Sequence, residues 1–183
     1  PGTFGGVLGY AFDDKRYLGK IDWNISDRHR ASFTYQQTKN VQPAVAGNST
    51  NSVGLASYTY TTALKTDNYV VHLFDDWTEN FSTESSVSYQ KFDQVRVPPT
   101  PLQPMVTVIV GPNASTGSGS SVIMGTDQFS DYNVLHIKSW NGFFAGTYTV
   151  GDHSIKGGFD YQQNQIYNLF GRRTNGVYTF NCI

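Results

Sequence analysis

Cysteine, basic charge and long apolar runs are what this sequence has least of. The 183-residue chain contains a single cysteine, Cys182, which excludes an internal disulfide and a cysteine-based zinc site. Its formal net charge is −1, so no basic field indicates nucleic-acid binding. No run of about 18 apolar residues occurs, which excludes a transmembrane helix. The chain begins at Pro1 rather than at a methionine, and we expect it to be part of a longer protein.

Aromatic residues and glycine are plentiful instead. The sequence holds 12 tyrosines, 12 phenylalanines and 18 glycines, together with many threonines, serines and asparagines, whereas leucine is scarce. This bias favours strands and turns over helices. The low mean hydropathy does not exclude a membrane barrel, because barrel strands are only half apolar.

The clearest pattern is a hairpin that turns at Gly151-Asp152. Its second arm alternates strictly, with Ile155, Gly157, Phe159 and Tyr161 on one face and Lys156, Gly158, Asp160 and Gln162 on the other. A soluble sheet would bury the apolar face under a second layer. A membrane barrel would turn that face to lipid and line its lumen with the polar face.

Three such hairpins are predicted, at about residues 16–40, 64–97 and 134–170, joined by long connections at 41–63 and 98–133. Loops longer than about 12–15 residues are uncommon in compact soluble domains. Short turns alternating with long loops are expected of outer-membrane barrels, whose short turns lie on the periplasmic side. The pattern therefore predicts an all-β, antiparallel up-and-down meander of about six to seven strands, an open section of a transmembrane β-barrel wall.

Two further short strands are predicted outside the three hairpins. Residues 105–110 are apolar and β-branched, and residues 177–180 follow a turn at 174–176 and start one more strand. Six or seven strands cannot close a barrel, because single-chain outer-membrane barrels need at least about eight. We therefore interpret the chain as one piece of a barrel wall.

Aromatic residues recur at a fixed height above the short turns. Trp23, Trp77 and Tyr148 each lie three residues before the first residue of a predicted turn. Amphipathic rings prefer the headgroup level of a membrane, and outer-membrane barrels carry such rings as girdles. We predict that these three residues form an interface girdle.

Five charged residues of the hairpins fall on the polar face. Lys20, Asp22, Arg30, Lys156 and Asp160 all alternate with the apolar positions, which predicts that they face a watery lumen. A lysine or arginine facing lipid at mid-bilayer would cost roughly 2–4 kcal/mol. The alternation avoids that cost for all five residues.

No set of residues indicates catalysis or metal binding. The four histidines have no His, Cys or carboxylate partner at a metal-ligand spacing, and two of them, His29 and His153, fall in predicted turns where we expect solvated side chains. Asp75 and Asp76 are neighbours on a strand, so they point to opposite faces and cannot converge on a substrate. We predict no enzyme activity, no cofactor and no metal site.

Several segments resemble a known family in the order in which they occur. Residues 20–30 (Lys-Ile-Asp-Trp-Asn-Ile-Ser-Asp-Arg-His-Arg) resemble an early barrel hairpin of TonB-dependent outer-membrane receptors. The segments that are similar to the Oar-like subgroup of those receptors are 125–129, 133–135, 158–161, 166–170 and 178–180. The resemblance covers roughly residues 16–180.

This resemblance implies a large barrel of about twenty-two strands, plugged by an N-terminal domain that receives energy through TonB. Neither the plug nor a TonB-contact segment is found in this sequence. The expected function is a segment of a bacterial outer-membrane receptor that moves a nutrient or other cargo of unknown identity. Its expected partners are outer-membrane lipid and, through the plug, TonB, with cargo choice made by the loops at 41–63 and 98–133.

Two alternatives remain open from the sequence. A secreted, soluble β-sandwich that binds carbohydrate through loop aromatics, or serves as an adhesion module, shows the same alternation of apolar and polar residues. An outer-membrane barrel used for adhesion or export differs from the receptor only in machinery outside this chain.

Overall fold

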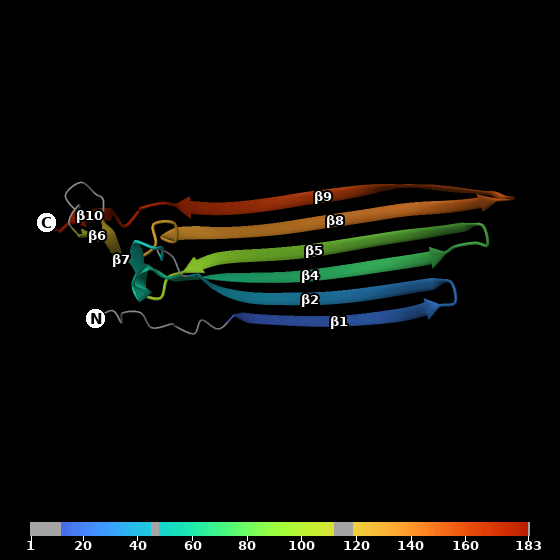
Figure 1. The fold of residues 1–183 in the computed structure, drawn as a ribbon. Coiled ribbons are helices and arrows are strands. Elements are labelled where there is room, and N and C mark those ends of the chain that lie inside the picture. Colours follow the sequence, from blue (N-terminus) through green and yellow to red (C-terminus); the bar gives the residue numbers. More distant parts are fainter. Residues whose placement is uncertain (1–11, 45–47, 112–118, 183) are drawn as a thin grey trace.

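The computed structural model describes residues 12–44, 48–111 and 119–182, which form two sheets (Figure 1). The larger sheet, here called the wall, has six strands in the order β1-β2-β4-β5-β8-β9, and each pair of neighbours is antiparallel. The wall strands are β1 (Asp13–Ser26), β2 (His29–Ala44), β4 (Tyr60–Asp76), β5 (Phe81–Val97), β8 (Tyr132–Val150) and β9 (His153–Gly171). The predicted all-β antiparallel meander is confirmed, as an open sheet.

Short turns join the wall strands in pairs at one end. Gly151 has a φ of 56°, the left-handed value that the first central residue of a primed hairpin turn requires. Between β4 and β5 the chain turns at residues 77–80, and Phe81 is the first residue of β5. All three short turns lie at the end of the wall opposite the small sheet (Figure 1).

The wall strands are longer than a bilayer requires. The hairpins span residues 13–44, 60–97 and 132–171, beyond the limits predicted from the alternation, because ladder pairing continues where the apolar pattern stops. Each strand has 14 to 19 residues, whereas about 9–11 tilted residues cross the hydrocarbon core. Part of each strand therefore lies outside the apolar layer.

The long connections and the segment after β9 build the small sheet, whose strand order is β10-β6-β7-β3. Its elements are β3 (Ser52–Gly54), η1 (Ala56–Tyr58, a 3-10 helix), β6 (Met105–Val110), β7 (Ser120–Met124) and β10 (Val177–Asn181). The strand expected at 105–110 is β6. The strand expected at 177–180 is β10, which pairs in parallel with β6 and not with a strand of the wall. Left-handed bends at Arg173 and Gly176 separate β10 from β9.

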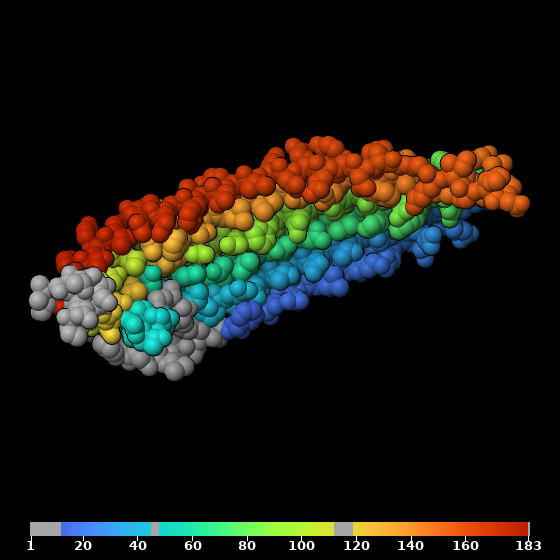
Figure 2. Space-filling model, turned by 45° about the horizontal axis from the view of Figure 1, so that its top comes forward, coloured from blue at the N-terminus to red at the C-terminus, as the bar shows by residue number. Residues whose placement is uncertain are grey.

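The wall is one layer thick. Among the described residues, the only buried apolar side chains are Tyr58, Met105 and Ala145, whereas Trp23 is 63% exposed and Phe159 is 65% exposed. The small sheet lies at the end of the wall rather than over its apolar face (Figure 1). This arrangement does not fit the β-sandwich alternative, which needs that face sealed under a second sheet. Figure 2 shows the wall strands lying side by side in sequence order, from blue at β1 to red at β9.

Candidate functional site

The two faces of the wall are the candidate site. One ladder row of the apolar face runs through Ile21, Phe33, Val71 and Val87, which are successive partners on β1, β2, β4 and β5. The residues next to them, such as Asp22, Ser32, Val70 and Ser88, point to the opposite, polar face. The register thus places the apolar residues of all three hairpins on one continuous face and their polar residues on the other.

A row of stacked rings crosses the apolar face about midway along the strands, on the loop side of the apolar band. Tyr35, Tyr69, Tyr89 and Trp140 are successive ladder partners on β2, β4, β5 and β8. Their ring centroids are 4.9, 6.3 and 4.6 Å apart from one neighbour to the next. We call these four residues the loop-side aromatic row. This row was not predicted from the sequence. A signal for it is the repeated spacing of eight residues between two aromatic residues, as in Tyr69 and Trp77.

A second group of rings lies near the short turns. Trp23 and Tyr148 lie in β1 and β8, and Phe81 is the ladder partner of Tyr148. Trp77 lies in the turn after β4, where its Nε1 donates a hydrogen bond of 2.8 Å to Thr83 Oγ1. Trp23, Trp77, Phe81 and Tyr148 are called the turn-side aromatic group. It contains the three residues predicted as a girdle, and their place at a membrane interface stays a prediction.

His29 belongs to this turn-side region and is not a solvated turn residue. It is the first residue of β2, its Nδ1 lies 2.7 Å from Asp75 Oδ1, and its ring meets that of Trp77 at 5.2 Å in an edge geometry. The expectation of a free turn histidine is wrong because strand pairing between β2 and β4 places His29 directly opposite Asp75.

The distance between the two aromatic groups matches a membrane. Tyr89 and Phe81, like Trp140 and Tyr148, are eight residues apart on one strand, which is roughly 26 Å of strand length. At a strand tilt of roughly 40° this crosses about 20 Å, close to the apolar band of about 25 Å between the girdles of outer-membrane barrels. The apolar side chains between the groups, such as Phe144, are exposed.

The drift of the rings across the strands also fits tilted strands. Following ladder partners from β1 through β2, β4 and β5 to β8 leads from Trp23 to Phe144 in four steps. Phe144 is four residues from Tyr148, so the aromatic position shifts by four residues over four strands. With strands about 4.8 Å apart, a rise of about 3.3 Å per residue and a tilt of roughly 40°, a membrane plane shifts by about one residue per strand. Trp23 and Tyr148 can therefore lie at the same depth.

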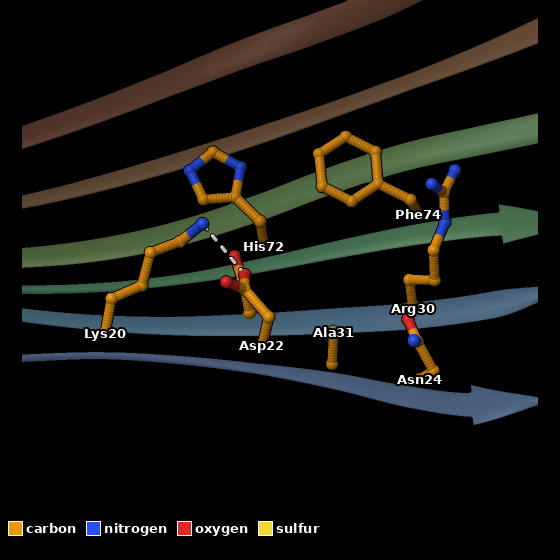
Figure 3. Close-up of a pocket in the computed structure, with 8 residues that line it drawn as sticks. Lys20, Asp22, Asn24, Arg30, Ala31, His72 and Phe74 are labelled. Atoms are coloured by element: carbon orange, nitrogen blue, oxygen red, sulfur yellow. Dashed lines mark ion pairs between the residues drawn. The ribbon is translucent and has the colours of Figure 1, made fainter.

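The polar face carries the predicted charged residues and is hollowed where they meet. Lys20 Nζ and Asp22 Oδ1 form an ion pair of 2.8 Å. With Arg30, His72 and Phe74 they line a hollow of about 420 Å³ (Figure 3). The Arg30 guanidinium lies 6.0 Å from the centre of the Phe74 ring, and the His72 ring stacks on the same ring at 6.0 Å.

The other two predicted charges lie further along the same face. Lys156 on β9 donates a hydrogen bond of 3.2 Å to Glu84 Oε2 on β5, reaching across β8. Asp160 borders a second hollow of about 390 Å³ together with Lys156 and Phe143. All five predicted residues share one face, but the structure brings them together as two separate groups. That this face lines a lumen stays a prediction.

A buried polar cluster fastens the loops to the wall at the loop side. Thr126, Asp127, Ser130 and Asp131 are each at most 7% exposed. Asp127 Oδ2 accepts hydrogen bonds of 2.9 Å from Ser130 Oγ and 3.2 Å from the Phe129 amide. The sequence analysis used residues 125–129 only for resemblance and did not predict this structural role.

The same cluster reaches the two segments on either side of it. Asp131 Oδ2 accepts hydrogen bonds of 2.9 Å from Thr174 Oγ1 and 3.2 Å from the Asn175 amide, which fixes the path from β9 to β10. Burial, together with the nearby Asp127 carboxylate, raises the pKa of Tyr58 to about 12. The loops are therefore held by polar contacts rather than by a large apolar core.

No three or more His, Cys, Asp or Glu side chains of the described ranges gather where they could hold a metal ion. Asp75 and Asp76 point to opposite faces, and Asp75 is held by His29. Nor is any helix in the described part of the chain long and apolar enough to cross a membrane.

Comparison with known proteins agrees with this geometry. A family model described as an outer membrane beta barrel domain matches residues 4–182, nearly the whole chain. The chain belongs to this family and is located in the bacterial outer membrane. No curated protein and no solved structure matches the chain.

Proposed function

We propose that this chain is a wall segment of a TonB-dependent outer-membrane receptor, which moves a nutrient or other cargo across the outer membrane. The observation that carries the proposal is the polar face, whose long ionic side chains stand over open hollows. Narrow barrels of about eight strands fill their interior with packed side chains. Exposed ion pairs and hollows on this face favour a wide barrel whose lumen holds water or a plug.

The resemblance of segments such as 20–30 and 158–161 to TonB-dependent receptors supports the same reading. In this proposal the pairs Lys20–Asp22 and Lys156–Glu84 face the lumen and adjoin the plug. The loops fastened by Asp127 and Asp131 present the surface that selects the cargo.

The proposal requires more strands than the wall contains. Outer-membrane barrels of one chain have at least about eight strands, and six are described here. The strands at the two edges, β1 and β9, are exposed along nearly their whole length. We propose that further strands pair with both edges, because an unpaired edge in a bilayer leaves its N–H and C=O groups unsatisfied.

Binding to TonB tests the receptor function most directly. The full-length protein that contains this chain is placed in lipid nanodiscs and titrated with the purified periplasmic domain of TonB from the same host. The proposal predicts saturable binding that disappears when the N-terminal plug segment is deleted. A full-length protein without a plug domain, or one that does not bind this domain, would instead support a barrel for adhesion or export.

A further inference from the structure

A belt of lysines lies on the apolar side of the wall, beyond the loop-side aromatic row. It consists of Lys15, Lys39, Lys65, Lys91 and Lys138, and we call it the lysine belt. Three of them, Lys15, Lys39 and Lys65, are direct ladder partners on β1, β2 and β4. The other two, Lys91 and Lys138, are direct partners on β5 and β8.

The belt shares the face and the orientation of the aromatic row. Lys39 is four residues from Tyr35 on β2, and Lys138 is two residues from Trp140 on β8, so their side chains point the same way. The belt therefore lies roughly 7–13 Å of strand length beyond the rings, on the side of the long connections. In outer-membrane barrels this side faces the cell exterior, so the belt lies at the headgroups of the outer leaflet.

Like charges directly opposite each other on neighbouring strands destabilise a sheet, because their Cβ atoms are only about 4.5–5.5 Å apart. The belt repeats this arrangement three times, at Lys15–Lys39, Lys39–Lys65 and Lys91–Lys138. Each of these facing pairs is therefore a cost that some other interaction has to offset.

The chain offsets only part of that cost. Lys15, Lys65 and Lys91 pair with Asp13, Asp67 and Asp93 on their own strands at 2.8–2.9 Å. Lys39 and Lys138 are exposed, and neither forms an ion pair with another described residue. Three carboxylates thus face five ammonium groups.

The carboxylates of the belt are also already engaged by other groups. Asp67 Oδ1 accepts hydrogen bonds from Tyr35 Oη at 3.1 Å and from Gln37 Nε2 at 2.6 Å. Asp93 Oδ1 lies 2.5 Å from His136 Nδ1. Asp67 and Asp93 also lie directly opposite Lys91 and Lys65 in the β4–β5 ladder, so these two lysines are neutralised. The excess positive charge is therefore that of Lys39 and Lys138, which stay exposed without an ion pair among the described residues.

We propose that the lysine belt binds the phosphates of a phosphorylated glycolipid in the outer leaflet. A phosphate between two facing lysines replaces their repulsion by two charge-assisted contacts. Because the lysine belt lies next to the aromatic row, a lipid whose phosphate is bound there can lay its acyl chains against the apolar band between the two aromatic groups. The inference depends on the orientation of the barrel and not on the TonB proposal.

Lipid titration tests the proposal with matched variants. The full-length protein in nanodiscs is titrated with lipopolysaccharide, with its dephosphorylated form and with inorganic phosphate alone. The variant Lys39→Gln/Lys138→Gln removes the two lysines without an ion pair, and Lys20→Gln/Lys156→Gln makes the same charge change on the polar face. We expect the first variant to bind lipopolysaccharide about tenfold or more weakly, since each lysine near anionic lipid contributes measurably. The second variant should bind like the unaltered protein.

Two further comparisons separate a charge effect from a folding effect. The variant Lys39→Arg/Lys138→Arg should retain binding of lipopolysaccharide. Dephosphorylated lipopolysaccharide should bind the unaltered protein weakly, with an affinity like that of lipopolysaccharide for Lys39→Gln/Lys138→Gln. If Lys39→Gln/Lys138→Gln does not fold, each single change is measured instead, and each should weaken binding. Equal affinity of all variants, equal loss in the polar-face variant, or full competition by inorganic phosphate would overturn the proposal.

Discussion

Tyr89 and Trp140 face each other across the β5–β8 ladder with their ring centroids 4.6 Å apart, on a face that no second layer of the described chain covers. Aromatic pairs of this kind contribute about 0.5–1.5 kcal/mol beyond the area that they bury. Within the loop-side aromatic row, each ring therefore stabilises the fold through contact with the neighbouring ring, in addition to any contact with the membrane.

The first prediction concerns this pair. In the full-length protein in bilayers, Tyr89→Ala and Trp140→Ala should show a coupling of about 0.5–1.5 kcal/mol in a double-mutant cycle measured by urea unfolding. Tyr89→Ala with Tyr148→Ala is the control, because these residues belong to different aromatic groups and their effects should add. Additive effects in the Tyr89–Trp140 cycle would show that the rings contribute independently.

The second prediction compares neighbours on opposite faces. Phe144 lies midway between Trp140 and Tyr148 on the apolar face, whereas Phe143 borders a hollow of the polar face. Phe144→Arg should lower the free energy of unfolding by about 2–4 kcal/mol or more, because the charge would lie near the bilayer centre. Phe143→Arg should cost much less, since its side chain meets water. Equal costs for the two variants would contradict the assignment of faces.

The third prediction concerns the close approach of β8 and β9. A Cβ added at Gly158 would lie 2.8 Å from Ala145 Cα, whereas one added at Gly157 would have no heavy atom within 4 Å. Gly158→Ala should therefore destabilise the protein by about 1–3 kcal/mol through overpacking, and Gly157→Ala should change little. Thermal unfolding of both variants measures the difference, and a greater loss in Gly157→Ala would contradict this packing.

The fourth prediction concerns alkaline pH at the loop side. Because burial and Asp127 raise the pKa of Tyr58 to about 12 from its ordinary value of 10.0, the folded state holds this proton more tightly than the unfolded state. The stability that Tyr58 contributes is present below pH 10 and is lost as pH rises from 10 to about 12. Protease cleavage of the loops should increase over this range less steeply in Tyr58→Phe than in the unaltered protein. Identical pH profiles would contradict the shift.

The sequence predicted the strands of the wall well, but it did not show which residues of different strands lie beside one another. Alternation such as that from Ile155 to Tyr161 depends on one strand, so it is visible locally. The loop-side aromatic row and the lysine belt draw one residue from each of several strands, and only the register aligns them. Residue spacing along the chain therefore could not show either feature.

Long-range pairing also explains the errors in detail. β10 has the composition of a wall strand, but it pairs with β6, about 70 residues earlier in the chain, because two left-handed bends turn it away from β9. His29 falls in a predicted polar turn, yet pairing with β4 sets it against Asp75. Neither partner lies near enough in sequence to be inferred from local pattern.

The most direct test of the account is spin-label accessibility along β5 of the full-length protein in bilayers, in a cysteine-free background. Thr83, Ser85 and Val87 lie on the apolar face, and Glu84, Ser86 and Ser88 lie on the polar face. We predict that labels at the first three sites collide mainly with oxygen, which concentrates in lipid, and labels at the other three mainly with a water-soluble nickel chelate. This includes Thr83 and Ser85, which composition alone would assign to water. A reversed pattern, or water accessibility at all six sites, would contradict the assignment of lipid to this face.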